Sequence, residues 1–287
     1  MRVIMLSQTV TLVALASLAV AGGRTAGPSG PRPGSPSGLP PAHTVIVVLE
    51  NHAYGEIIGS PQAPFLNALA HQGALFTASY AQTHPSQPNY LALFSGSTQG
   101  VTGDSCPQRF SAPNLASELI AAGLSFAGYA EGLPATGSPV CAAGRYARRH
   151  VPWADFSNVP ASASRPFSRF PRGHYTRLPT VSFVIPDVCH DMHSCPVSSG
   201  DHWLQADLGG YARWAMTHDS LLIVTFDEND GSAGNRIPTI FAGQVVRPGP
   251  YPMRISHYRV LRTIELLYGL APIGHAATTR TITGIWN

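Results

Sequence analysis

The chain has 287 residues, of which 44% are hydrophobic, and its formal net charge at pH 7 is only +3. It contains arginine but no lysine, and the arginines are scattered except at Arg145, Arg148 and Arg149. A general nucleic-acid-binding protein would carry a stronger and more continuous basic stripe. We therefore expect no nucleic-acid partner.

The first residues have the pattern of a secretory signal peptide. Arg2 precedes an apolar run over residues 10–21, and the small-residue pattern Ala19-Val20-Ala21 predicts cleavage after Ala21. A transmembrane anchor is the alternative, but the run is shorter than the roughly 20 residues that span a bilayer. We predict a secreted protein, extracellular or held at the cell envelope, with no stable membrane anchor.

The region after the signal peptide divides into a linker and a folded part. Residues 22–42 are rich in proline, glycine and serine and have too few apolar side chains to form a core. Residues 43–287 are predicted to form a single domain, because this length is normal for one α/β layer structure.

Four cysteines lie in the folded part, and an even number in an exported chain favours disulfides. The short separation of Cys189 and Cys195 suggests the pairs Cys189–Cys195 and Cys106–Cys141, although spacing alone leaves other connectivities open. A zinc site is the alternative, but no Cys-x-x-Cys pair occurs.

Apolar, β-branched runs of strand length alternate with amphipathic helical patterns along the folded part. Residues 134–177, rich in proline, serine and arginine, are predicted to form an irregular excursion that walls or covers the site. This alternation predicts an α/β fold, a three-layer α/β/α sandwich with a largely parallel central sheet. In chain order we predict a strand at 43–49, helices at 63–72, 89–94 and 114–122, a strand at 179–186, a helix at 203–217, strands at 220–226 and 237–243, and a helix at 257–268.

The ligand site of such a sheet lies at the carboxyl ends of its strands. Any one polar run after a strand can be an ordinary turn or helix cap. Three such runs together favour a site, because they bring carboxylates, an amide and imidazoles to one edge. The runs are Glu50-Asn51-His52, Asp187 to His193, and Asp227-Glu228-Asn229-Asp230-Gly231.

Carboxylates clustered at a buried edge raise one another's pKa unless a cation lies among them, so we predict one divalent metal ion. The oxygen donors suit Mg²⁺, Ca²⁺ or Mn²⁺, whereas the imidazoles leave Zn²⁺ or Fe open. The candidate ligands are Glu50, Asn51, Asp227 and Glu228.

Ser86 lies in the segment Thr83-His84-Pro85-Ser86, just before the helix predicted from Asn89. Free backbone N–H groups and the helix dipole at such a position attract an anionic phosphoryl group, which favours a nucleophile. The alternative is that Ser86 only caps the helix, the commoner role of serine there. Local spacing leaves both interpretations open.

Seven ordered motifs are similar to those of a known family: VIVVLENH, THPSQPNYLALFSG, FVIPDVCHDMHSC, GDHWL, LLIVTFDENDG, IPTIFAG and SHYRVLRTIE. They resemble the bacterial phosphoesterase family of acid phosphatases and phospholipases C, within the alkaline phosphatase superfamily. The segments GYAEGLP and VPWADFSNVP are especially similar to small secreted acid phosphatases of mycobacterial type. The resemblance covers the chain from His43 and implies an alkaline phosphatase-like fold.

The resemblance implies that the four candidate ligands hold a metal ion that also contacts the Ser86 oxygen. Ser86 is then the nucleophile, and it forms a phosphoserine intermediate that water hydrolyses. The implied phosphate-binding or proton-donating residues are His190, His193 and His257. The implied supporting residues are His84, Asp187, Asp191 and Asp201.

Relatives with two zinc ions place the second ion near the equivalents of Asp187, His190 and His257. We favour the one-metal arrangement, in which imidazolium groups replace the second cation. Because imidazole is a cation only below its pKa, near 6.5, an acidic pH optimum follows.

The predicted function is that of a secreted, metal-dependent acid phosphatase acting on small phosphomonoesters, with phosphoinositide headgroups among the candidate substrates. A phospholipase C-type phosphodiesterase acting on membrane lipids is the first alternative, which the short chain disfavours. An exported binding module without catalysis is the second, which the filled motif positions disfavour.

Overall fold

The computed structural model describes residues 40–232 and 234–287. The predicted signal peptide and nearly all of the predicted linker lie outside the described residues. No described helix is long and apolar enough to cross a membrane.

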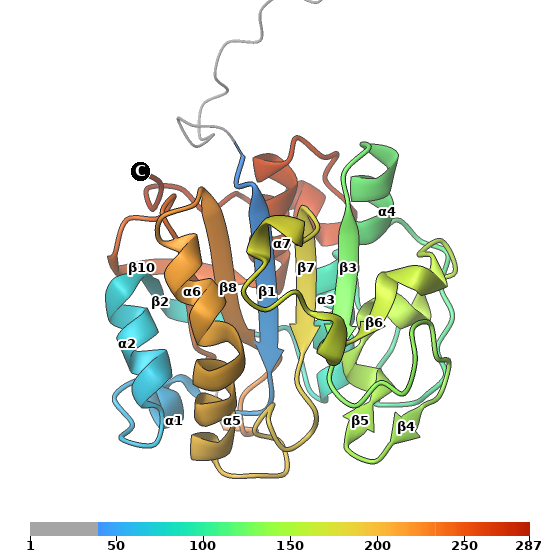
Figure 1. The fold of residues 1–287 in the computed structure, drawn as a ribbon, viewed down its shortest axis with the longest axis horizontal. Coiled ribbons are helices and arrows are strands. Elements are labelled where there is room, and N and C mark those ends of the chain that lie inside the picture. The colour runs from blue at the N-terminus through green and yellow to red at the C-terminus, as the bar shows by residue number, and fades with distance from the viewer. Residues whose placement is uncertain (1–39, 233) are drawn as a thin grey trace, which may run out of the picture. The chain divides into compact units, whose positions relative to one another are not determined.

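A mixed eight-stranded sheet forms the centre of the fold, in the order β10-β2-β9-β8-β1-β7-β3-β6 (Figure 1). β1 pairs in parallel with both β7 and β8, whereas β9 is antiparallel to its neighbours β8 and β2. The predicted largely parallel sheet is therefore confirmed. Its strands are β1 (His43–Leu49), β2 (Ala74–Tyr80), β3 (Phe126–Ala130), β6 (Ser164–Pro166), β7 (Val181–Ile185), β8 (Ser220–Phe226), β9 (Thr239–Ala242) and β10 (Gly249–Ser256), while β4 (Ala142–Ala143) and β5 (Tyr146–Ala147) form a separate ribbon.

Helices cover both faces of the sheet. The α-helices are α1 (Tyr54–Ile57), α2 (Pro64–Gln72), α3 (Ser86–Ser95), α4 (Leu115–Ala121), α5 (Val197–Trp203), α6 (Gly209–Ala215) and α7 (His257–Leu267). A π-helical segment, η6 (Leu204–Leu208), joins α5 to α6. The 3-10 helices are η1 (Arg148–His150), η2 (Pro152–Asp155), η3 (Ala161–Ala163), η4 (Phe167–Arg169), η5 (Tyr175–Arg177) and η7 (Gly274–Thr278).

The side chains of β1 show why the fold has three layers. Val45 and Val47 pack in the core that α2, α5 and α6 cover on the near face of Figure 1, whereas Ile46 and Val48 pack in the core beneath α3, α4 and α7. Successive side chains of a strand point to opposite faces, so a continuous apolar run has to be buried on both. This confirms the predicted sandwich.

Two predicted elements differ from the structure. The helix expected at 203–217 begins earlier, at Val197, and is interrupted by η6. The segment 134–177 is not irregular throughout, because it supplies β6 to the central sheet and buries Trp153. In both places tertiary packing outweighs the weak local signal of serine, glycine and proline.

Both predicted disulfides, Cys106–Cys141 and Cys189–Cys195, are present. All four cysteines of the chain are thereby used. The alternative of a zinc site built on cysteine thiolates is therefore wrong.

The carboxyl group of Glu265, on α7, is fully buried. One oxygen accepts the amide of Ile273 at 3.0 Å, and Arg262 Nη1 lies 3.7 Å from the other. Burial raises the pKa of Glu265 to about 7, because the hydrogen bond and Arg262 only partly offset the loss of hydration.

The free energy of unfolding should therefore include a contribution from Glu265 that falls as the pH rises from 4.5 to about 7. The unfolded carboxyl group ionises near its ordinary pKa of 4.5, whereas the folded one stays protonated up to about pH 7, so ionisation favours the unfolded chain between these values. We expect Glu265→Gln, which keeps an oxygen for the Ile273 amide, to reduce this decrease in denaturant titrations. Equal pH dependence in both proteins would contradict the assignment.

Candidate active site

Acidic side chains meet where β1 and β8, neighbouring parallel strands, reach their carboxyl ends. Glu50 and Asn51 follow β1, and Asp227 and Glu228 follow β8. The three carboxylate residues are at most 2% exposed. With Ser86 they form what we call the Ser86 cluster: Glu50, Asn51, Ser86, Asp227 and Glu228.

Ser86 is the first residue of α3, but it does not cap the helix. The N-cap position is Pro85, and no side chain makes a capping hydrogen bond there. The Ser86 hydroxyl instead points at three acceptors: Glu50 Oε2 at 2.9 Å, Glu228 Oε1 at 3.1 Å and Asn51 Oδ1 at 3.5 Å. These three oxygens compete for one hydroxyl proton, which excludes the interpretation of Ser86 as a mere cap.

The carboxylates of the cluster disfavour one another's ionisation. Burial raises the pKa of Glu50, Asp227 and Glu228. The charge of Asp191 and then that of Glu228 raise it further for Glu50, and the charges of Glu50 and Glu228 raise it further for Asp227. Asp227 Oδ1 accepts the Asn51 amide at 3.1 Å, but its buried Oδ2 has no hydrogen-bond partner among the described residues. Oxygen acceptors thus outnumber donors, and a hard divalent cation fits this donor set.

Glu50 is held from the side opposite Ser86. Its Oε1 accepts the hydroxyl of Tyr90 and lies 3.3 Å from His150 Nε2. The His150 ring stacks on Tyr90 with centroids 5.2 Å apart, and its Nδ1 lies 3.2 Å from Asp191 Oδ2. Burial, and then the charge of Arg149, lowers the pKa of His150.

The sequence interpretation missed His150 as a site residue. It follows two arginines in the segment 134–177, and no strand end or ligand spacing marks it. One ligand atom each of Glu50, His150 and Asp191 lies within 4.8 Å of the others, so these residues form a second group that could hold a metal.

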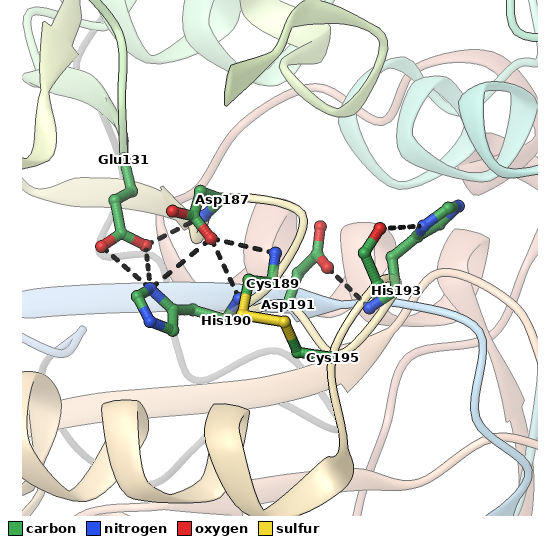
Figure 2. The surroundings of a disulfide bond; sticks show 8 residues. Glu131, Asp187, Cys189, His190, Asp191, His193 and Cys195 are labelled. Atoms are coloured by element: carbon green, nitrogen blue, oxygen red, sulfur yellow. Dashed lines mark hydrogen bonds and ion pairs between the residues drawn. A yellow bond between two sulfur atoms is a disulfide. The ribbon is translucent and has the colours of Figure 1, made fainter. Parts of the chain in front are cut away.

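The loop from Asp187 to Cys195 sends its two histidines to different places. Figure 2 shows His190 turned toward Glu131 and Asp187, whereas His193 lies on the other side of the disulfide. His190 Nδ1 is 2.9 Å from Glu131 Oε2 and 3.5 Å from Asp187 Oδ1. Asp187 Oδ1 also accepts the amides of Cys189 and His190. Asp187 and His190, the alternative second-metal ligands, therefore lie together, but Cys189 beside them is in a disulfide and offers no thiolate.

His193 and His257 approach from different elements. The backbone amide of His193 donates to Asp191 Oδ1 at 2.8 Å, and its ring centroid lies 6.2 Å from that of His150. His257, the first residue of α7, places Nε2 2.7 Å from the carbonyl oxygen of Asp227. Burial lowers the pKa of His257 to about 4, so in this structure it is a neutral donor that holds the Asp227 backbone.

Two further predicted residues have clear partners. His84 Nδ1 lies 2.5 Å from Glu228 Oε2, which places it at the edge of the Ser86 cluster. Asp201 accepts the amides of Phe65 and Leu66 at 3.0 and 2.8 Å, so it caps α2 from α5.

The turn before Ser86 is clamped by Asn89, which is fully buried. Asn89 Oδ1 accepts the amides of Gln82 and Thr83, and Nδ2 donates to the carbonyls of Thr83 and Pro85. Asp104, which the sequence interpretation missed, accepts the Gln87 amide at 2.9 Å. One of the N–H groups expected to be free at the start of α3 is therefore occupied by a carboxylate.

Comparisons with known proteins identify the family of the chain. A model of the phosphoesterase family matches residues 60–271. The chain is 56% identical over 247 residues to a phosphatidylinositol-3-phosphatase of Mycobacterium tuberculosis, covering 85% of this chain and 83% of that protein. It is 29% identical over 233 residues to a phosphate-repressible acid phosphatase of Penicillium chrysogenum, covering 73% of this chain and 55% of that protein.

Solved structures show the same fold. A protein of the alkaline phosphatase superfamily from Vibrio parahaemolyticus superposes with a TM-score of 0.60 at 16% identity, covering 87% of this chain and 73% of that one. The lipoteichoic acid synthase LtaP from Listeria monocytogenes gives a TM-score of 0.56 at 11% identity, covering 80% and 72%. From the family match and the mycobacterial relative, the chain belongs to the phosphoesterase family of phosphoric ester hydrolases.

Proposed function

We propose that the chain is a secreted phosphatase that hydrolyses phosphate monoesters with Ser86 Oγ as the nucleophile. The observation that carries the proposal is the position of this hydroxyl, at the start of α3 and facing oxygens of Glu50, Asn51 and Glu228. The start of a helix favours an anionic group. The Ser86 hydroxyl faces the three oxygens and makes no capping hydrogen bond to the helix. This arrangement suits attack on phosphorus.

The substrate class and the export follow from further observations. The mycobacterial relative is named a phosphatidylinositol-3-phosphatase and the fungal one an acid phosphatase. We therefore propose small phosphomonoesters as substrates, and phosphoinositide headgroups among them. Two disulfides and the signal-peptide pattern of residues 1–21 support export, since disulfides persist in oxidising compartments.

Oxygens of Glu50, Asn51, Asp227 and Glu228 would hold one divalent cation, of which Mg²⁺, Ca²⁺ and Mn²⁺ suit such donors best. When bound, the cation lowers the pKa of the Ser86 hydroxyl and neutralises charge on the phosphoryl group. The unpartnered Asp227 Oδ2 and the competition of three acceptors for one Ser86 proton support this assignment.

The reaction then proceeds in two displacements. Ser86 Oγ forms a bond to phosphorus as its proton passes to Glu50 Oε2, 2.9 Å away, and the bond from phosphorus to the alcohol oxygen breaks. We assign the proton that the leaving alcohol takes up to His193, whose ring is partly exposed beside His150. Water then attacks the phosphoserine as one of its protons passes to His193, the bond from phosphorus to Ser86 Oγ breaks, and Ser86 Oγ takes back the proton held by Glu50. Tyr90 and His150 orient Glu50 throughout.

Ser86→Ala should lower kcat for p-nitrophenyl phosphate at least about a thousandfold, because the nucleophile is lost. Ser95→Ala is the matched control, since Ser95 ends the same helix and its hydroxyl donates only locally, to the carbonyls of Leu91 and Ser97. Full activity of Ser86→Ala would refute the nucleophile. Release of phosphocholine from phosphatidylcholine, without phosphate release from the monoester, would favour the phospholipase C alternative.

Chelation of divalent cations should abolish the activity, and adding back one ion at a time should restore it. Mg²⁺, Ca²⁺, Mn²⁺, Zn²⁺ and Fe²⁺ are tested separately, and metal content is measured by mass spectrometry on the same samples. We expect one ion per chain in the active protein and a lower content in Asp227→Asn. Activity that persists in demonstrably metal-free protein would contradict the metal site.

Asn89→Ala should reduce both stability and activity, because it releases the turn that places Ser86. The loss of about four hydrogen bonds at roughly 1 kcal/mol each sets the expected loss in free energy of unfolding. Asn67→Ala is the control, since Asn67 makes four such backbone bonds around residues 57–63, away from Ser86. We expect both variants to unfold at lower urea, and only Asn89→Ala to lose at least about tenfold in kcat. Equal kcat losses would count against the clamp.

A further inference from the structure

A second polar pocket, of about 330 Å³, lies between the end of β2, the start of α7 and the C-terminal segment. Its wall includes Tyr80, Gln82 and Ser256, and three arginines, Arg254, Arg259 and Arg280. We call these three side chains and the space that they line the arginine pocket. None of its residues belongs to the Ser86 cluster.

The positive charge of the arginine pocket is not neutralised by the chain. No acidic residue is among those that line it. The arginine–carboxylate ion pairs of the described residues involve Arg148, Arg172 and Arg262, and so none of the three pocket arginines. Guanidinium groups gathered without a counter-charge favour an anion.

Arg259 and Arg280 lie close enough to repel each other. Burial lowers the pKa of Arg259, and the charge of Arg280 lowers it further. An anion between the two groups would remove this repulsion. Guanidinium groups bind phosphate oxygens through paired N–H donors, so phosphate is the anion that this lining suits.

Two of the arginines are held in place before any ligand binds. The guanidinium group of Arg259 donates to the carbonyls of Arg254 at 2.8 Å and of Thr281 at 3.0 and 3.3 Å. The guanidinium group of Arg254 lies over the Tyr80 ring, 3.9 Å from its centroid. Arg259 uses three of its five N–H donors in these bonds, so two remain for a ligand. Little side-chain conformational freedom would therefore be lost on binding.

The arginine pocket adjoins the Ser86 cluster along two stretches of chain. Gln82 stands four residues before Ser86, so their Cα atoms are at most about 14 Å apart. The amide of Gln82 is held by Asn89, the residue that clamps the turn before Ser86. Ser256 is followed directly by His257, whose ring holds the Asp227 carbonyl. The wall of the pocket is therefore joined to the Ser86 cluster by short stretches of chain on two sides.

We propose that the arginine pocket binds a second phosphate group of the substrate, the phosphodiester of a phosphoinositide headgroup whose monoester phosphate lies at Ser86. The proposal rests on the phosphatase function proposed above and adds a basis for substrate choice. A substrate with one phosphate group gains no binding energy from the pocket. A substrate with two phosphate groups is bound by the Ser86 cluster at one group and by the arginine pocket at the other.

The test compares two substrates in one double variant, Arg254→Gln/Arg280→Gln. Among the described residues, the guanidinium groups of Arg254 and Arg280 donate no hydrogen bond, so replacing them breaks none. Arg259 is kept because its guanidinium group holds two backbone carbonyls. The substrates are p-nitrophenyl phosphate and a water-soluble short-chain phosphatidylinositol 3-phosphate. Arg169→Gln/Arg177→Gln, at two exposed positions on η4 and η5, removes the same charge elsewhere and serves as control.

We expect the pocket variant to raise KM for the phosphoinositide at least about tenfold, the scale of one charge-assisted hydrogen bond, with kcat unchanged. KM for p-nitrophenyl phosphate should change less than about twofold, as should both KM values in the control. Glycerophosphoinositol, which has the phosphodiester alone, should inhibit phosphoinositide hydrolysis by the unmodified protein and not by the pocket variant.

Other outcomes overturn the proposal in distinguishable ways. An unmodified protein that hydrolyses neither substrate refutes the phosphatase function itself. Active protein with the same phosphoinositide KM in the pocket variant refutes only the arginine pocket, as does an equal KM rise for both substrates. A further outcome is that sulfate changes the turnover of p-nitrophenyl phosphate in the unmodified protein but not in the pocket variant, while the variant leaves KM unchanged for both substrates. That result would refute the proposal and assign the pocket to an anion separate from the substrate. If the double variant fails to fold, Arg280→Gln alone, at an exposed position, gives the same comparison.

Discussion

The competition of three oxygens for the proton of Ser86 is the constraint around which the site is arranged. Glu50, Asn51 and Glu228 all face this hydroxyl, and Asp227 adds a buried oxygen without a partner. Buried carboxylates are costly unless they are paired, protonated or bound to a cation. The fold meets part of this cost with the Tyr90 hydroxyl on Glu50 and the Asn51 amide on Asp227. The remainder requires a cation or a proton from outside the cluster.

The position of Ser86 is fixed mainly from within its own helix, α3. α3 is buried along its whole length, and Asn89 within it ties down the turn from Gln82 to Pro85. A nucleophile attacks in line only when its position is fixed to a fraction of an ångström. The charge of Asp104 on the Gln87 amide shows that the start of α3 already binds a carboxylate. An incoming phosphoryl group that uses this amide has to displace it.

The sequence predicts the acidic part of this site because those residues follow strands. The apolar runs that end at Leu49 and Phe226 identify β1 and β8, and parallel neighbours deliver Glu50 and Asp227 to one edge. The antiparallel direction of β9 and the role of His150 have no such signal. His150 reaches Glu50 from a 3-10 helix in a proline-rich segment, and its stacking on Tyr90 and its contact with Asp191 fix it there. Contacts made by tertiary packing are not encoded in spacing.

The proposed arginine pocket would separate the residues that choose the substrate from those that carry out the reaction. Among the described residues, no arginine donates a hydrogen bond to a carboxylate of the Ser86 cluster, and Arg148 is already paired with Asp155. Burial lowers the pKa of the nearby imidazoles of His150 and His257, so protonating them requires acid. In the proposed reaction, a bound cation would therefore have to neutralise the charge on the phosphoryl group. The arginines beyond Gln82 stay available for negative charge elsewhere on the substrate. A one-phosphate ester needs only the first of these two regions, whereas a phosphoinositide headgroup would use both.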